Sequence, residues 1–257
     1  MEKRPLIFIT NDDGITAPGI AHLISVAKEF GELCIIAPDK PQSGMGHAIT
    51  INSSLRLHPT SYYQSTNEFA CSGTPVDCVK LAINQILHRK PDLVLSGINH
   101  GSNLSINVIY SGTMSAAVEA AVEGIPAIGF SLCDYAHEAD FTQASAYLKS
   151  VIGTILQDGL PKGVCLNVNI PKLKADELKG LKVCRQSNAM WEEEFDERKD
   201  PYGRPYYWLT GVFKNFEPES TDTDVFAVDQ GYISIVPVHA DMTAHEAINS
   251  LRNKLEK

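Results

Sequence analysis

The chain has 257 residues, of which 44% are hydrophobic and 21% charged, as is usual for a globular protein. Its 22 Lys and Arg residues against 31 Asp and Glu residues give a formal net charge of −9. This acidic excess argues against a nucleic-acid polymer or an anionic membrane as a partner, because both bind to basic surfaces. It does not argue against a small anionic substrate.

Neither a secretion signal nor a membrane span is indicated, so the expected location is the cytoplasm. The apolar run of the first strand is shorter than the roughly 7–15 residues of a signal peptide's hydrophobic region. The longest stretch of small and apolar residues carries Glu119 and Glu123, which a membrane helix would have to bury. The cysteines show no CxxC spacing, which disfavours a zinc cluster.

Short apolar runs alternate with amphipathic helices along most of the chain. Helices are expected to begin at Pro18 and at Pro75, because proline suits a first helical turn, and Thr74 can cap the second of them. Such strand–helix units predict an α/β fold, a Rossmann-like, mostly parallel sheet with helices on both faces. No GxGxxG follows the first strand, so the dinucleotide-binding fingerprint is absent. The expected strands are 6–10, 33–37, 92–95, 125–130 and 164–169.

The character of the sequence changes beyond about residue 185. Eight aromatic residues, including both tryptophans, lie between Trp191 and Phe216 and flank the turn-like stretch KDPYGRP. This pattern predicts an extended β-hairpin arm. Its aromatic side chains need a surface to pack on, which is either another subunit or the core of the same chain.

A late strand at 232–238 and a terminal helix follow the arm, and Thr243 with Glu246 matches a capping box at the start of that helix. We therefore divide the chain into a Rossmann-like core, residues 1–185, and a C-terminal extension, residues 186–257, that serves oligomerisation.

Three polar loops follow the first three expected strands of the core, and ligands of open parallel sheets bind at that edge. One loop places Asp12 beside Asp13. Two such carboxylates repel each other by about 3–4 kcal/mol at an effective dielectric near 20, so they need a cation or a proton. Oxygens of Ser43 and Asn99, in the other two loops, complete a set that suits Mg²⁺, Mn²⁺ or Ca²⁺ better than zinc.

A solvated turn that caps the next helix is the alternative interpretation of the Asp-Asp pair. The position of the pair directly after a buried strand favours a site. The two acids are adjacent, whereas phosphatases that form an aspartyl-phosphate separate theirs by one residue. This disfavours that class without excluding Asp12 as a nucleophile.

Further along the chain, Ser111-Gly112-Thr113 opens a helix of small residues, and such a helix start can seat a phosphate group. Capping by Ser111 or Thr113 is compatible with that role. His47 and His100 lie in two of the polar loops, where each could be a general acid or a structural residue. Neither a GxSxG elbow nor a Walker A motif occurs.

Six blocks in order along the chain together closely resemble the SurE (survival protein E) family: ITNDDGITAPGI, PDKPQSGMGHAIT, CSGTPVDCVKLA, PDLVLSGINHGSN, VIYSGTMSAAVEA and TDTDVFAVDQGYISIVPV. They run from residue 9 to residue 238, and the segment 186–216 is the least similar to the family pattern. The resemblance implies a metal-dependent 5′-nucleotidase that hydrolyses nucleoside monophosphates, in some members together with 3′-nucleotides and short polyphosphate. It also implies a homodimer or tetramer that exchanges the C-terminal extension.

The resemblance also maps functional residues onto this chain. The ligands of one divalent cation per subunit, Mg²⁺ or Mn²⁺, are expected to be Asp12, Asp13, Ser43 and Asn99. From the residues themselves, and not from the resemblance, we expect Asp12 to act as base or nucleophile. The substrate-binding residues are expected, on the same ground, to be Asn99, Asn103, Ser111, Gly112 and Thr113. A broad phosphomonoesterase or exopolyphosphatase and a non-catalytic metal–nucleotide sensor are the alternative functions.

Overall fold

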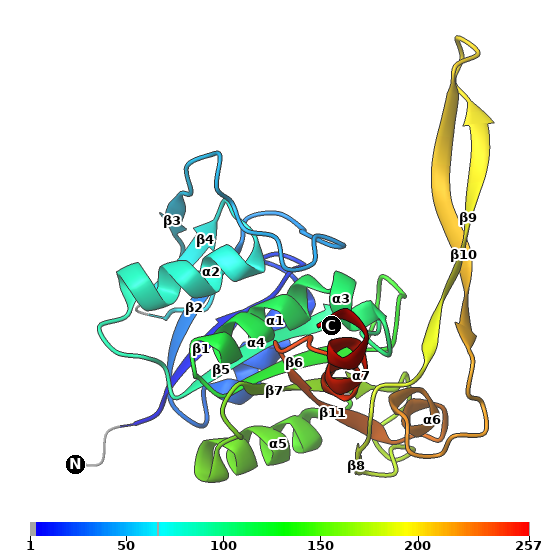
Figure 1. Ribbon diagram of the computed structural model, residues 1–257. Helices are drawn as coiled ribbons and strands as arrows, with labels where there is room; N and C mark the ends of the chain where they lie inside the picture. Colours follow the sequence, from blue (N-terminus) through cyan, green and yellow to red (C-terminus); the bar gives the residue numbers. More distant parts are fainter. Residues whose placement is uncertain (1–3, 66, 257) are drawn as a thin grey trace.

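A nine-stranded sheet forms the centre of the structure, a computed structural model that describes residues 4–65 and 67–256 (Figure 1). In chain order the strands are β1 (Leu6–Thr10), β2 (Glu32–Pro38), β3 (Leu57–Pro59), β4 (Asn67–Cys71), β5 (Leu93–His100), β6 (Ala127–Leu132), β7 (Val164–Ile170), β8 (Leu181–Val183) and β11 (Ile233–His239). Their order across the sheet is β3-β4-β2-β1-β5-β6-β7-β11-β8. Pairing is parallel except between β3 and β4 and between β7 and β11.

Helices cover both faces of this sheet. On one face α1 (Pro18–Ala27) and α5 (Ser145–Asp158) pack with alternate strand residues such as Ile7 and Ile9. On the other face α2 (Pro75–Leu81) and α4 (Gly112–Val122) pack with the intervening residues Leu6 and Phe8. Strand β1 is therefore buried on both sides, as its unbroken apolar sequence requires. The predicted fold class is confirmed.

The start of α2 follows the sequence prediction. The Thr74 hydroxyl accepts a hydrogen bond from the backbone N–H of Asp77, and the Asp77 carboxylate accepts one from the backbone N–H of Thr74. Pro75 occupies the first turn. After Leu81 the helix widens into a π-helical turn, η1 (Ala82–Ile86).

The C-terminal helix α7 (His245–Leu255) is present, but its predicted capping box is wrong. The Asp241 carboxylate accepts a hydrogen bond from the backbone N–H of Thr243 at 2.9 Å, which turns the chain before the helix begins. Ala244 consequently occupies the cap position, where it offers no side-chain oxygen. Two short helices, α3 (Asn107–Tyr110) and α6 (Asp224–Asp229), were not predicted. Among the described residues no helix is long and apolar enough to cross a bilayer.

The predicted hairpin arm is confirmed. Strand β9 (Ala189–Lys199) pairs antiparallel with β10 (Pro205–Asn215) along the whole length of both strands, and the arm projects away from the sheet (Figure 1). In the turn, the Asp200 carboxylate accepts hydrogen bonds from the backbone N–H groups of Tyr202 and Arg204.

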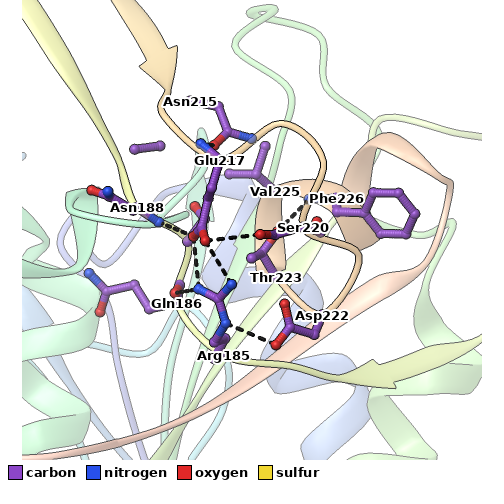
Figure 2. A network of polar contacts seen from close by, with 12 residues as sticks. Arg185, Gln186, Asn188, Asn215, Glu217, Ser220, Asp222, Thr223, Val225 and Phe226 are labelled. Atoms are coloured by element: carbon purple, nitrogen blue, oxygen red, sulfur yellow. Dashed lines mark hydrogen bonds and ion pairs between the residues drawn. The ribbon is translucent and has the colours of Figure 1, made fainter.

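A polar network joins the two ends of the arm where they enter the body of the molecule (Figure 2). The Arg185 guanidinium makes two hydrogen bonds to Glu217, at 2.8 and 2.7 Å, and a third to Asp222. Glu217 also accepts a hydrogen bond from the backbone N–H of Asn188, just before β9. The Arg185 guanidinium lowers the pKa of Glu217 to about 2, so the network stays ionised at neutral pH.

Candidate active site

The three polar loops meet at the carboxyl ends of β1 and β5, around a cavity of about 240 Å³. Five of the predicted site residues line this cavity: Asp12, Ser43, Asn99, Asn103 and Ser111. Of the other three predicted residues, Gly112 and Thr113 lie behind the Asp12 side chain, as described below. Asp13 is half-buried, and its carboxylate accepts a hydrogen bond from the backbone N–H of His100. The remaining lining residues are Gly44, His100, Ser102, Asn107, Tyr110, Tyr135 and Trp191.

Asp12 lies against the first turn of α4. Its side chain is almost fully buried, and its Oδ1 accepts a hydrogen bond from the Thr113 hydroxyl at 2.5 Å. A Cβ placed on Gly112 would lie 2.7 Å from the Asp12 Cβ and 3.0 Å from its Oδ2, so only glycine allows this approach. The predicted phosphate seat at this helix start is thus partly used within the protein, since Gly112 and Thr113 hold the Asp12 carboxylate.

Burial dominates the electrostatics of the two acids. Burial raises the pKa of Asp12, opposed by hydrogen bonds from the Thr113 hydroxyl and from backbone N–H groups that include that of Gly112. Burial and the neighbouring Asp12 charge raise the pKa of Asp13 to about 6, opposed by a hydrogen bond from the backbone N–H of His100. Among the described residues no Lys or Arg forms an ion pair with either carboxylate. The pair therefore lacks a compensating cation of its own.

An irregularity in β5 positions Asn99. The register between β5 and β6 shifts between Ser96 and Asn99, and Gly97 occupies the shift with a φ of +122°. A Cβ on Gly97 would lie 2.4 Å from the Phe130 carbonyl oxygen. The Asn99 amide nitrogen donates to the Gly101 carbonyl at 2.8 Å, which leaves its Oδ1 as the atom to face a ligand.

Ser43 lies in the long loop between β2 and β3 and lines the cavity. Next to it, the backbone N–H of Gln42 donates to the Asp12 carbonyl at 2.8 Å. Ser111 caps α4, with its Oγ accepting a hydrogen bond from the backbone N–H of Met114 at 3.0 Å. The Ser111 hydroxyl proton is therefore free to donate into the cavity.

A network of buried amides holds Asn103 in the cavity wall. Its side-chain amide donates to Ser131 Oγ at 2.7 Å, and its backbone N–H donates to Asn169 Oδ1 at 2.8 Å. Asn167 donates in turn to the Asn103 carbonyl. One N–H of the Asn103 amide remains for a ligand.

Sequence reasoning missed the aromatic side of the site. A second cavity, of about 600 Å³, shares four lining residues with the first, namely Gly44, Asn107, Tyr110 and Trp191, and continues between them and Leu209, Thr210 and Gly211 of the arm. We call this second cavity the aromatic cleft. The Trp191 Nε1–H donates to Asn107 Oδ1 at 2.8 Å, which ties the arm to α3. No local sequence pattern indicates that the base of the arm folds back onto this loop.

A buried carboxylate fixes the arm next to the cavity. Asp224 is fully buried and accepts hydrogen bonds from the backbone N–H groups of Ser105 and Ser187, at 2.8 and 2.9 Å. Ser105 lies on the cavity loop and Ser187 directly before the arm. The aromatic cleft is therefore built between two segments that one side chain holds together.

The two histidines face protein groups. The His47 ring makes a 2.8 Å hydrogen bond to Glu119, and the His100 ring donates to the Ala136 carbonyl at 2.6 Å. The His100 ring also packs edge-on against Phe141. These contacts favour a structural role for both rings over that of a general acid.

The donor set at Asp12 and Asp13 fits a hard divalent cation. Asp12 is buried and Asp13 half-buried, and neither carboxylate has a Lys or Arg partner among the described residues. Together with the free Asn99 Oδ1 and the Ser43 hydroxyl, they supply oxygen ligands of the kind that Mg²⁺ and Mn²⁺ take. Within residues 4–65 and 67–256 no group of three or more His, Cys, Asp or Glu side chains could hold a metal ion. A cation at this site would thus need the neutral oxygens as well as the two carboxylates.

The raised pKa of Asp13 predicts a pH-dependent stability of the metal-free protein. The pKa of Asp13 is about 6 in the folded chain against an ordinary value of 3.8. The folded state is therefore most stable below pH 4, where Asp13 is protonated, and its free energy of unfolding falls as the pH rises through 6. Asp13→Asn removes this fall, which is on the order of 1–3 kcal/mol. In EDTA, the Tm of Asp13→Asn should exceed that of the unaltered chain by several degrees at pH 8 and by much less at pH 4.5. The exposed Asp176→Asn is the control, and an equal gain at both pH values would contradict the prediction.

Comparison with known proteins agrees with this geometry. Residues 7–193 match the family described as Survival protein SurE. The chain is 62% identical over 252 residues to a protein named 5′-nucleotidase SurE from Christiangramia forsetii. The match covers 97% of this chain and 96% of the relative. It is also 62% identical to the protein of the same name from Flavobacterium psychrophilum, over 98% of each chain.

In three dimensions the chain is similar to the crystal structure of the SurE protein from Aquifex aeolicus. The TM-score is 0.85 at 38% sequence identity, and the match covers 98% of this chain and 100% of that one. Sequence and fold thus agree over nearly the full length. The chain belongs to the SurE family.

Proposed function

We propose that this chain is a cytoplasmic, metal-dependent 5′-nucleotidase that hydrolyses nucleoside monophosphates to nucleoside and phosphate. The observation that carries the proposal is the double cavity: a polar part around Asp12 and Asn99 opens into the aromatic cleft. A phosphate group suits the first part and a nucleoside the second. The names of the relatives, 5′-nucleotidase SurE, support the same substrate class.

One cation, Mg²⁺ or Mn²⁺, would be held by Asp12, Asp13, Ser43 and Asn99. When bound, it supplies a Lewis acid for the phosphoryl group and lowers the pKa of a water molecule. Its charge would offset the repulsion between the two carboxylates, one buried and one half-buried, which have no Lys or Arg partner among the described residues.

Asp12 is the residue proposed to act on the reacting atoms, as base or as nucleophile. Burial raises its pKa, so the carboxylate accepts a proton more readily than a solvated aspartate does. The hydrogen bond from Thr113 and the close approach of Gly112 fix its orientation before the substrate arrives. Thr113 and Gly112 therefore contribute by holding Asp12.

The phosphate oxygens would be held by groups whose hydrogen bonds within the protein leave one donor free. The Ser111 hydroxyl proton and the second N–H of the Asn103 amide are such donors. Both belong to rigid surroundings, a helix cap and a buried amide network. These two donors therefore need little movement to bind the phosphate. Such preorganised donors stabilise the negative charge on the phosphoryl oxygens in the transition state.

The nucleobase would lie in the aromatic cleft, between Tyr110 and Trp191. Asn107 Oδ1 already accepts a hydrogen bond from Trp191, and the Thr210 hydroxyl donates to the Glu194 carbonyl. With two aromatic rings in the lining, we propose that stacking outweighs hydrogen bonding in this cleft. Stacking tolerates every base, because each base has a π face.

The C-terminal extension, residues 186–257, is proposed to join two copies of the chain into a homodimer, or two such dimers into a tetramer, while residues 1–185 carry the chemistry. Phe195 and Tyr207 on the arm are 66% and 57% exposed, and α7 buries none of its residues in a single chain. A free two-stranded hairpin is only marginally stable in water, so a second copy is the surface we propose for these side chains.

A phosphate-release panel tests the proposed reaction. With Mg²⁺ or Mn²⁺ the chain should release phosphate from AMP, GMP, CMP and UMP faster than from 3′-nucleotides, short polyphosphate and simple phosphomonoesters, and EDTA should stop the reaction. Asp12→Asn should lower kcat at least about 100-fold, the lower range for loss of a general base, without a change in circular dichroism. The exposed Asp158→Asn is the control. Activity that survives EDTA would overturn the metal assignment, and nucleotide binding without release would indicate a sensor.

Removal of the Trp191 ring tests the placement of the base. Trp191→Ala should lower kcat/KM for AMP and UMP by about 5–150-fold, because stacking on an aromatic residue contributes about 1–3 kcal/mol per base. The kcat/KM for ribose 5-phosphate, which has no base, should not change. Trp208→Ala is the matched control, since Trp208 pairs with Asp196 and so lies on the opposite face of the hairpin from Trp191. An equal loss on ribose 5-phosphate would contradict the placement.

A charge on the exposed face of the arm tests the proposed assembly. Phe195→Glu should shift the chain from dimer towards monomer in sedimentation velocity, because a buried interface does not accommodate an unpaired charge. Tyr202→Glu, which introduces the same charge at the turn of the arm, should sediment like the unaltered chain. A monomeric unaltered chain at micromolar concentration would contradict the assembly.

A further inference from the structure

The loop that carries Ser43 is held mainly by individual hydrogen bonds. It connects β2 to β3 without a helix or strand of its own. Thr50 and Ala48 tie its far end to the start of α2, through Asp77 and Thr74. Nearer to Ser43, the side chain that anchors the loop is that of His47, which bonds to Glu119 at 2.8 Å.

Glu119 is unusual for its position. It is 5% exposed in α4, a helix otherwise made of small and apolar residues that pack on the sheet. Its two oxygens bind different elements: Oε2 contacts His47 of the loop, and Oε1 accepts a hydrogen bond from Lys80 of α2. Both partners lower the pKa of Glu119, so the carboxylate is charged at neutral pH. The mechanism above does not use this buried carboxylate or its two partners.

Helix α4 connects Glu119 to the active site. Residues seven apart in a helix lie on nearly the same face, about 10 Å apart along the axis. Glu119 follows Gly112 by seven residues, so the face that holds Asp12 at its first turn also holds the Ser43 loop two turns later. One rigid element thereby sets the position of two proposed metal ligands that are 31 residues apart in the sequence.

We propose that Glu119 is a positioning residue that acts through His47 to hold Ser43 at the cation site around Asp12 and Asp13. The inference rests on the proposed metal-dependent function and extends it to residues outside the cavity. Lys80 compensates the second oxygen of Glu119, which allows the carboxylate to remain buried and charged.

Binding of Mn²⁺ alone, followed by electron paramagnetic resonance on the full chain, tests this inference without turnover. His47→Ala should raise the Kd for Mn²⁺ about 10-fold or more, the range found when a group that orients a metal ligand is lost. His47→Gln should restore most of the affinity, because its amide nitrogen replaces the Nε2 that contacts Glu119. Glu119→Gln should weaken Mn²⁺ binding in the same direction. With saturating Mn²⁺, His47→Ala should keep kcat for AMP within about 3-fold of the unaltered chain.

A double variant separates positioning of Ser43 from a general loss of structure. If His47 acts through Ser43, then His47→Ala should raise the Kd little further in the Ser43→Ala background, whereas a general destabilisation would add its full effect. His58→Ala, an exposed histidine of β3, is the control and should bind Mn²⁺ like the unaltered chain.

Two outcomes would overturn the inference alone: unchanged Mn²⁺ affinity in His47→Ala, or the same loss in the presence and absence of the Ser43 hydroxyl. If the unaltered chain bound no Mn²⁺ but released phosphate from AMP, the inference would fall together with the metal site. If it bound Mn²⁺ without releasing phosphate, the proposed reaction would fall and the positioning role would stand.

Discussion

The contact between Asp12 and the first turn of α4 organises the rest of this molecule. A carboxylate at the end of the central strand β1 lies within van der Waals distance of Gly112, where a single added carbon would collide with it. That contact buries the acid and raises its pKa, while Thr113 keeps it oriented. The Asp12 side chain in turn forms part of the lining of the polar cavity, next to Ser43 and Asn99.

Around this contact the fold brings together groups with different tasks from distant parts of the chain. The loop after β5 contributes Asn99, whose side-chain nitrogen is occupied and whose oxygen is free. The arm contributes Trp191, which reaches the same cavity from the C-terminal extension. Asp224 joins these two parts by accepting hydrogen bonds from both. The site therefore depends on buried polar links as much as on the sheet itself.

Much of this architecture could be predicted from the sequence where the signal is local. The start of α2 at Thr74 and Pro75 was predicted correctly, because capping depends on residues three positions apart. The gathering of Asp12, Ser43 and Asn99 followed from the shared edge of parallel strands. Contacts between distant residues were not predictable: nothing near His47 indicates that its partner is Glu119, 72 residues later. The capping box predicted at Thr243 is wrong because the backbone N–H of Thr243 donates to the Asp241 carboxylate, so that the helix begins after Ala244.

The division of the cavity between sheet and arm has an evolutionary consequence. One wall of the aromatic cleft, from Leu209 to Gly211, belongs to a hairpin whose two strands form a sheet of their own, apart from the central sheet. Substitutions there do not alter the loop after β1, which carries Asp12. Descendants of this sequence can therefore change part of the surface that meets the leaving group while they retain the same reaction, because that part lies outside the loops that carry Asp12, Ser43 and Asn99.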